Sequence, residues 1–257
     1  MSESTSRVLT ERRGHVLVVT LNRPEVRNAC DREMAHGVAA AMDLLDGEDD
    51  LFVGIITGAW GHFSAGADLK EAARGALRER PARGGFGIFK RPSRKPLIAA
   101  VEGFAVGGGF EVCLACDLVV AARNARMGLP EVRHNVVAVG GALFRLPRRM
   151  PYNVAMELAL SGELREAAFF ADHGLVNRLV EPGQALQAAM ELAEHIMING
   201  PTALAATKEI MYQGVNWHED EAWERQASLA QAALGSEDFK EGLKAFAEKR
   251  KPVWKGR

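Results

Sequence analysis

Short apolar runs alternate with longer amphipathic stretches through the first half of the chain. The apolar runs have no polar interruption, which predicts strands buried on both faces of a sheet. Arg13-Gly14 predicts a hairpin between the first two, and Asn22-Arg23-Pro24 ends the second, because proline cannot continue a central ladder. Strands interleaved with helices indicate an α/β core. The predicted strands are residues 8–11, 16–21, 52–57, 97–101 and 118–122.

The amphipathic stretches predict helices. Asp31 has the side chain of a good N-cap, and Met34, Val38 and Leu45 follow at helical spacing. Gly200-Pro201 divides an α/β core of residues 1–199 from a C-terminal helical region of residues 200–257. The predicted helices after Tyr152 are residues 154–160, 184–199, 203–213, 219–234 and 238–250.

Residues 71–96 combine a helical start with glycine, proline and many cations. We interpret them as a helix that gives way to a mobile surface loop. The basic side chains are either solvated, which is the interpretation we favour, or they form a cradle for phosphates. They are Arg74, Arg78, Arg80, Arg83, Lys90, Arg91, Arg94 and Lys95.

Composition and charge narrow the function classes. The 257 residues are 47% hydrophobic and 25% charged, and the formal net charge of -1 gives no overall attraction to nucleic acid or membranes. No apolar run reaches the length of a membrane span, and residues 1–8 lack the apolar stretch of a signal peptide. We therefore expect a cytoplasmic protein with reduced thiols. Cys113 and Cys116 are interpreted as buried core thiols, because no second ligand pair stands at zinc-site spacing.

Two segments rich in small residues follow apolar strands and open helices. The first contains Ala65-Gly66-Ala67, and the second contains Gly107-Gly108-Gly109 with Glu111 in the first helical turn behind it. Small residues let a ligand approach the backbone, and free N–H groups at a helix start favour negative charge. Close packing of helix on strand is the alternative explanation for each. Three consecutive glycines do not make a dinucleotide fingerprint.

A third segment places a carboxylate after another strand. Glu131 follows Pro130 and stands 20 residues after Glu111. Alone it is best interpreted as a surface residue. If the fold brings the two glutamates together, however, two carboxylates that share one water can divide the acid and base duties.

In this order and spacing, the segments resemble the crotonase superfamily, known best for enoyl-CoA hydratases and isomerases. The resemblance implies the crotonase-like (ClpP/crotonase) fold of repeated β-β-α units. It also implies a C-terminal helical trimerisation region that builds homotrimers, often paired into hexamers. The resemblance spans nearly the whole chain, at residues 21–24, 27–29, 55–58, 63–69, 107–111, 116–117, 130–131, 174–176 and 248–250.

The resemblance also implies a reaction and a site. The backbone N–H groups of Ala67 and Gly108 would hold the thioester oxygen, while Glu111 and Glu131 would hold a water. This implies a hydro-lyase that adds water reversibly to a 2-enoyl-CoA through an enolate. No metal or cofactor is implied, because coenzyme A is part of the substrate. The residues implied to bind the substrate are Arg27, Ala29, Ala65, Gly66, Asp68, Leu69, Gly107 and Pro130, with Phe246 and Lys249 from a neighbouring subunit.

Within the superfamily the chain is similar to carnitinyl-CoA dehydratases, at residues 107–111, 145–147 and 246–257. Two departures bear on the acyl group. Ala138 stands where relatives usually have proline, and Phe169-Phe170 stand where smaller or polar residues are common. Dehydration of carnitinyl-CoA is therefore an alternative to hydration of a simpler 2-enoyl-CoA.

Two other functions stay open. An enoyl-CoA isomerase needs one well-placed base and no bound water, so the two acids argue against it. An RNA-binding homologue would call for a basic groove with interleaved aromatic residues, whereas the basic stretch contains only Phe86 and Phe89. We expect an acyl-CoA as the partner, and neither nucleic acid nor a membrane.

Overall fold

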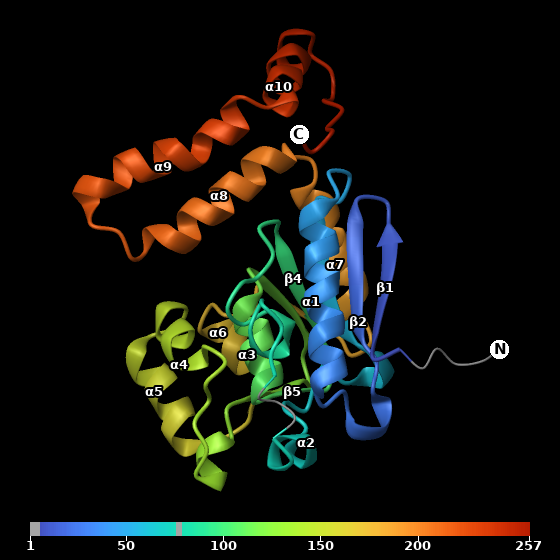
Figure 1. The fold of residues 1–257 in the computed structure, drawn as a ribbon, viewed down its shortest axis with the longest axis vertical. Helices are drawn as coiled ribbons and strands as arrows, with labels where there is room; N and C mark the ends of the chain where they lie inside the picture. The colour runs from blue at the N-terminus through green and yellow to red at the C-terminus, as the bar shows by residue number, and fades with distance from the viewer. Residues whose placement is uncertain (1–5, 76–78) are drawn as a thin grey trace, which may run out of the picture.

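A central six-stranded sheet forms the core of the computed structural model, which describes residues 6–75 and 79–257 (Figure 1). Its order is β1-β2-β3-β4-β6-β9, with β1 antiparallel to β2 and the other neighbours parallel. The predicted hairpin between the first two strands is confirmed. Residues 1–5 and Arg78 of the basic stretch lie outside the described residues. The strands are β1 (Val8–Arg13), β2 (Val16–Leu21), β3 (Val53–Gly58), β4 (Leu97–Val101), β6 (Leu118–Ala122) and β9 (Arg178–Val180).

Both faces of this sheet are covered, as the unbroken apolar strands predicted. Alternate side chains of β2 face opposite sides, because successive residues of a strand do so. Leu17 packs in a cluster with α1 (Arg32–Gly47) and α3 (Gly108–Ala115), and Val18 packs in a second cluster with α7 (Ala185–Ile196). The fully buried residues of α7 in that second cluster are small and four positions apart, which lets the helix lie close to the sheet: Ala185, Ala189 and Ala193.

Helix α1 begins where the sequence predicted. The Asp31 carboxylate accepts a hydrogen bond of 2.8 Å from the Met34 N–H and so caps the helix. The short helices α4 and α6, with 4 and 6 residues, were not predicted, because so few residues carry little periodicity. The other helices are α2 (Leu69–Ala73), α4 (Ala142–Arg145), α5 (Tyr152–Ser161), α6 (Ala167–Asp172), α8 (Pro201–Gly214), α9 (Glu219–Leu234) and α10 (Glu237–Ala247).

A second, three-stranded sheet has the order β5-β7-β8, from β5 (Phe104–Val106), β7 (Arg126–Gly128) and β8 (Arg165–Glu166). Here β5 follows β4 directly and leads into α3, which makes one of the β-β-α units implied by the resemblance. The sequence patterns did not predict these strands, because each has only two or three residues. They matter for the site, since β5 ends at the glycine turn.

Cys113 lies in the last turn of α3, and Cys116 is the residue that follows the helix. Both thiols are fully buried. Burial raises the pKa of Cys116 to about 12 and that of Cys113 well above its ordinary value. The interpretation of these residues as buried core thiols is confirmed.

The basic stretch is only partly the solvated loop that we expected. Residues 79–95 pack against α1, where Arg83 is only 3% exposed. Its guanidinium donates to Asp43 at 2.8 Å and to Asp46 at 2.6 Å. The expectation of a solvated side chain is wrong for Arg83, because two carboxylates of α1, distant in sequence, pair with it in a buried position.

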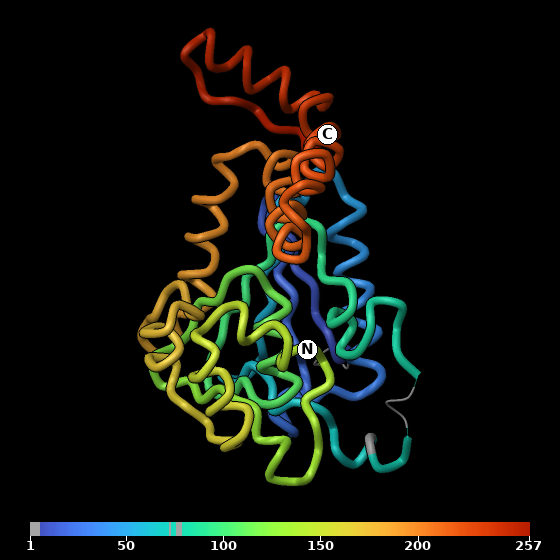
Figure 2. The backbone as a smooth tube through the Cα atoms, turned by 90° about the vertical axis from the view of Figure 1, so that its left-hand side faces the viewer, coloured from blue at the N-terminus to red at the C-terminus, as the bar shows by residue number. Residues whose placement is uncertain are grey.

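Helices α8, α9 and α10 extend from one end of the core (Figures 1 and 2). The Gly200-Pro201 boundary lies at the start of α8, and α9 has no buried residue in the described chain. The C-terminal tail returns to the core, where the Trp254 indole N–H donates to the Ile198 carbonyl at 3.0 Å. Among the described residues, none of the helices has the length and apolar character to pass through a membrane.

Candidate active site

The first small-residue segment is a sharp turn held from two sides. On one side, Ser64 forms backbone hydrogen bonds with β5. On the other, the Cys30 N–H donates to the Gly66 carbonyl at 2.8 Å, and the Ala65 N–H donates to the Arg27 carbonyl at 2.9 Å. The turn is thereby fixed, and its small side chains leave the backbone accessible.

The second small-residue segment turns the chain from β5 into α3. Gly107 has φ 56° and ψ -124°, a conformation that residues with a side chain rarely adopt. Its N–H donates to the Gly128 carbonyl of β7 at 2.9 Å. A Cβ on Gly107 would lie 3.0 Å from Glu131 Oε1, so glycine also leaves room for that carboxylate.

The N–H groups of Ala67 and Gly108 are free to meet a ligand. Within residues 6–75 and 79–257, neither donates to another group of the protein. The two turns touch, since a Cβ on Gly66 would lie 3.4 Å from the Gly108 nitrogen. The Gly108 N–H also stands at the start of α3, where the helix dipole favours negative charge. The pair therefore has the properties that an oxyanion site requires.

Glu111 is a buried carboxylate in the first turn of α3, only 4% exposed. Its Oε1 accepts a hydrogen bond of 3.1 Å from the Ala142 N–H, at the start of α4. Burial raises its pKa to about 7; the Ala142 hydrogen bond opposes this, and the negative charge of Glu131 adds to it. Glu111 can therefore exchange a proton near neutral pH.

Glu131 begins the 3-10 turn Glu131–His134, directly after β7 and Pro130. Its Oε2 is buried without a hydrogen-bond partner among the described residues. Burial raises the pKa of this carboxyl as well. An unpartnered buried oxygen is costly unless a ligand or a water completes it, so Glu131 is suited to hold one.

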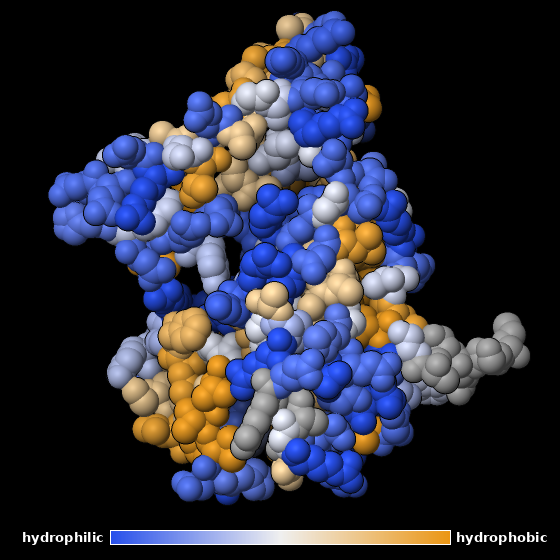
Figure 3. All heavy atoms as spheres, in the orientation of Figure 1, coloured by the Kyte–Doolittle hydropathy of each residue, from blue (hydrophilic) through white to orange (hydrophobic). Residues whose placement is uncertain are grey.

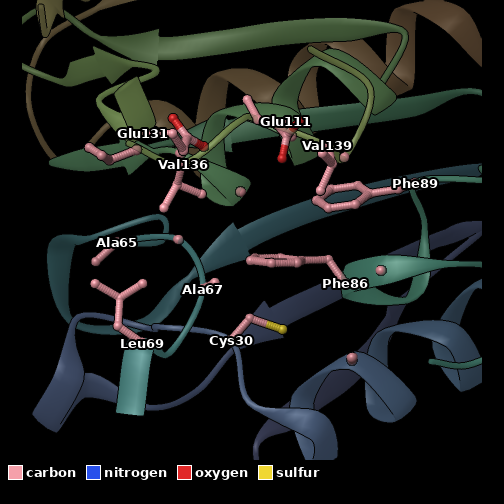
Figure 4. A pocket seen from close by; sticks show the side chains of 18 of the residues that line it. Cys30, Ala65, Ala67, Leu69, Phe86, Phe89, Glu111, Glu131, Val136 and Val139 are labelled. Atoms are coloured by element: carbon pink, nitrogen blue, oxygen red, sulfur yellow. The ribbon is translucent and has the colours of Figure 1, made fainter. Parts of the chain in front are cut away.

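A cavity of about 310 Å³ lies between the two turns and the two glutamates. Figure 4 shows Glu111 and Glu131 on one wall, with Ala65 and Ala67 facing them. The remaining wall is largely apolar. Such a cavity suits an apolar group next to a polar reaction centre. The apolar side chains that line it include Phe86, Phe89, Val136, Val137 and Val139.

Most of the predicted site residues meet at this cavity. Three others stand behind the first turn instead. The Arg27 carbonyl supports the turn, the Ala29 carbonyl accepts a hydrogen bond from Arg23, and Asp68 pairs with the same arginine at 3.1 Å. The predicted residues that line the cavity are Ala65, Gly66, Ala67, Leu69, Gly107, Gly108, Glu111, Pro130 and Glu131.

The two C-terminal residues predicted at the site do not line the cavity of their own chain. Phe246 is 86% exposed on α10, and Lys249 follows that helix with φ 54°. Figure 1 places α10 at the end of the molecule away from α2 and β5. A contribution of these residues to a site stays a prediction that requires a neighbouring chain.

The sequence patterns did not identify much of the apolar wall of the cavity. Phe86 stacks on Phe89 with ring centroids 4.9 Å apart, and both line the cavity. Three glycines around Phe86, at positions 84, 85 and 87, were a signal that the segment packs closely. Of the two departures noted above, Ala138 lines the cavity, whereas Phe170 packs on Phe110 in the core.

Known proteins share this fold and much of this sequence. The sequence model described as enoyl-CoA hydratase/isomerase matches residues 11–257. The chain is 42% identical to mevalonyl-coenzyme A hydratase of Aspergillus fumigatus, over 94% of this chain and 92% of the relative. It is 40% identical to carnitinyl-CoA dehydratase of Salmonella typhi, over 96% and 97%. A probable enoyl-CoA hydratase/isomerase from Mycobacterium abscessus has a crystal structure with TM-score 0.94 and 52% identity, covering 98% of this chain and 100% of that one.

The β-β-α core, the glycine turn and the paired glutamates define a protein of the crotonase class. The chain belongs to the enoyl-CoA hydratase/isomerase family, as the match over residues 11–257 shows. It is accordingly an enzyme of the hydro-lyase type.

Proposed function

We propose that the chain adds water reversibly to the double bond of a 2-enoyl-CoA, with Glu111 and Glu131 sharing the water and the amides of Ala67 and Gly108 holding the thioester oxygen. The observation that carries this proposal is the joint placement of two buried carboxylates and two unpartnered amides around one cavity. An isomerase requires only one of these acids.

The reaction follows from this arrangement. A water oxygen attacks the β-carbon, while one glutamate removes a proton from that water. Negative charge then moves to the thioester oxygen, where the Ala67 and Gly108 amides stabilise it; one such donor is typically worth about 3 to 4 kcal/mol. The α-carbon then takes a proton from the other glutamate. The proposal needs no metal and no cofactor beyond the CoA of the substrate.

The acyl group is proposed to be apolar near the double bond. The wall there consists of the Phe86 and Phe89 rings and of valines from residues 136–139. Arg32 and Glu79, which line the same cavity, pair with each other at 2.7 Å and so offer no unpaired charge to a polar acyl group. Two relatives are named for substrates with polar acyl groups, carnitinyl-CoA and mevalonyl-CoA. These polar substrates are therefore the alternatives to an apolar 2-enoyl-CoA.

The assembly is proposed to be a homotrimer or a dimer of trimers, built by the C-terminal region of residues 200–257. Exposed apolar side chains support it. Figure 3 shows apolar surface over α4 and α5, and the C-terminal helices expose more. In such an assembly, Phe246 and Lys249 would reach a neighbour's CoA. The exposed apolar residues include Val139, Phe144, Tyr152, Leu160, Met211, Trp223, Leu243 and Phe246.

A substrate panel tests the proposal. Crotonyl-CoA, longer 2-enoyl-CoAs and crotonobetainyl-CoA are each mixed with the enzyme, and loss of the conjugated thioester's absorbance is followed. We expect turnover of apolar 2-enoyl-CoAs and little of crotonobetainyl-CoA. Preference for crotonobetainyl-CoA would select the carnitinyl-CoA alternative. Conversion of a 3-enoyl-CoA, with no hydration of any 2-enoyl-CoA, would replace the proposal by isomerisation.

A further inference from the structure

Arg145, the last residue of α4, is a buried cation beside the cavity. It is 7% exposed, and no carboxylate of the described residues lies within ion-pair distance of its guanidinium. The guanidinium donates to the Gly140 carbonyl at 3.1 Å and to the Phe89 carbonyl at 2.5 Å. Its carbon lies 5.2 Å from the Phe144 ring centroid, and Nε has no hydrogen-bond partner among the described residues. A buried charge without an ion pair is expensive, which calls for an explanation.

The two carbonyls that Arg145 holds belong to the two sides of the Glu111 pocket. Gly140 lies between the Glu111 carboxylate and the Phe89 ring, since a Cβ there would lie 2.4 Å from Glu111 Oε2 and 2.3 Å from the Phe89 ring. Two residues further on, the Ala142 N–H donates to Glu111 Oε1. Arg145 therefore ties the wall at Phe89 to the turn that covers and hydrogen-bonds Glu111.

We propose that Arg145 is a positioning residue for the hydration reaction: it locks residues 140–142 over the Glu111 carboxylate and supplies the positive charge that keeps this acid in its working orientation. The inference rests on the proposed function for its kinetic part. It gives a function to a buried cation whose guanidinium is held by two backbone carbonyls and not by an ion pair.

Electrostatics agree with this geometry. Two charged groups act on Glu111 from the elements packed around it, Glu131 from the 3-10 turn and Arg145 from α4. Burial and Glu131 raise the pKa of Glu111, whereas Arg145 lowers it. Removing the guanidinium charge should therefore raise this pKa further, while lysine should largely preserve it.

The test compares Arg145→Met and Arg145→Lys with Arg149→Met. Arg149 is the control, because it is a partly buried cation whose guanidinium donates to the Cys116 carbonyl at 2.7 Å and does not line the cavity. With crotonyl-CoA, Arg145→Met should lower kcat about ten- to a hundredfold at little change in KM, the loss expected from a displaced catalytic group. The limb of its pH profile at about pH 7 should move to higher pH, because the charge that lowers the pKa of Glu111 is lost. Arg145→Lys should return the pH limb to its wild-type position and recover part of kcat. Arg149→Met should have the wild-type pH limb and the wild-type kcat.

A second readout does not depend on activity. Carboxyl NMR titration of Glu111, assigned by the loss of its signal in Glu111→Gln, should report a higher pKa in Arg145→Met than in the wild type. If kcat falls while the pH limb and this titration stay in place, Arg145 is only a structural brace and the inference is overturned. Unchanged kcat overturns it too. A wild-type enzyme inactive on the whole substrate panel would refute the proposed function, while the titration would still decide the link between Arg145 and Glu111.

Discussion

Glu111 and Glu131 carry the same carboxyl group in different surroundings. Glu111 accepts an N–H from Ala142 and lies in a closely packed pocket, whereas Glu131 has a buried oxygen without a partner. Burial raises the pKa of both, to about 7 for Glu111. At the residue scale, burial therefore raises the pKa of both acids, and Glu111, with a pKa of about 7, can take up or release a proton near neutral pH.

The first residue-scale prediction concerns turnover. Glu111→Gln and Glu131→Gln should each lower kcat at least about a hundredfold, because each removes a proton-transfer group. Neither acid is proposed to touch the nucleotide, so CoA affinity, measured by calorimetry, should barely change. Glu79→Gln, a change at the cavity edge, serves as the control and should keep most of kcat. Near-normal hydration by either catalytic variant would remove that residue from the mechanism.

The second residue-scale prediction concerns the stability of the folded protein at different pH values. The folded-state pKa of Glu111, about 7, lies above its ordinary value of 4.5, so its protonated form favours the folded state. That contribution is complete below pH 4.5 and is lost as the pH rises through 7. Glu111→Gln should therefore gain stability relative to the wild type across this window, by at most about 3 kcal/mol. Thermal unfolding at several pH values checks it, and an equal difference at all pH values contradicts it.

At the element scale, the start of α3 combines three demands on a few residues. Gly107 must adopt a left-handed turn, Gly108 must present its N–H, and Glu111 must reach the cavity from the first helical turn. The tip of the Phe86 ring also occupies the space where a Cβ on Gly108 would lie, at 2.4 Å. Any side chain placed at position 108 would therefore clash with the Phe86 ring. The ring has to be removed first, so that a variant reports the loss of the N–H and not this clash.

The element-scale prediction therefore compares two Gly108 variants in a protein that lacks the Phe86 ring. In a Phe86→Ala background, Gly108→Pro deletes the amide donor, while Gly108→Ala retains it with a similar Cβ. Proline is compatible with the first position of a helix, so both double variants should fold. The proline variant should have a kcat about a hundred- to a thousandfold below that of the alanine variant, the usual effect of losing one oxyanion donor. Equal rates would exclude the Gly108 amide from the oxyanion hole.

At the scale of the whole molecule, the C-terminal helices leave the core and expose large apolar side chains. Deleting these helices to test assembly would also remove Trp254, which donates to the Ile198 carbonyl, and the tail that packs against Asp49. Substitutions on α10 are a cleaner test of assembly. Leu243 and Phe246 are 58% and 86% exposed, so their replacement leaves the chain's own packing intact.

The whole-molecule prediction is that Leu243→Glu with Phe246→Glu weakens both assembly and CoA affinity. Charges placed in an apolar contact between subunits oppose association. Lys240→Glu, a charge change on the same helix without loss of apolar surface, should leave both unchanged. Light scattering measures assembly and calorimetry measures CoA binding. A monomeric wild-type enzyme that is fully active would contradict the proposed trimer.

The sequence by itself determined what depends on local pattern. The strand at residues 97–101, the cap at Asp31 and the buried thiols at the end of α3 follow from hydrophobic periodicity and side-chain chemistry, and the structure confirms each. The spacing of the small-residue turns and of Glu111 and Glu131 was also sufficient to identify the family.

Only the tertiary structure decided how distant residues meet. Asp43 and Asp46 bury Arg83, so a predicted surface loop becomes a packed wall that brings Phe86 to the cavity. The Ala142 N–H reaches Glu111 across 31 positions of sequence, and Arg145 reaches Phe89 across 56. Periodicity describes which side of an element is apolar, but it carries no information on which element faces it. The pKa of Glu111 and the lining of the acyl cavity arise from those long-range contacts, and so they could not be predicted from the chain alone.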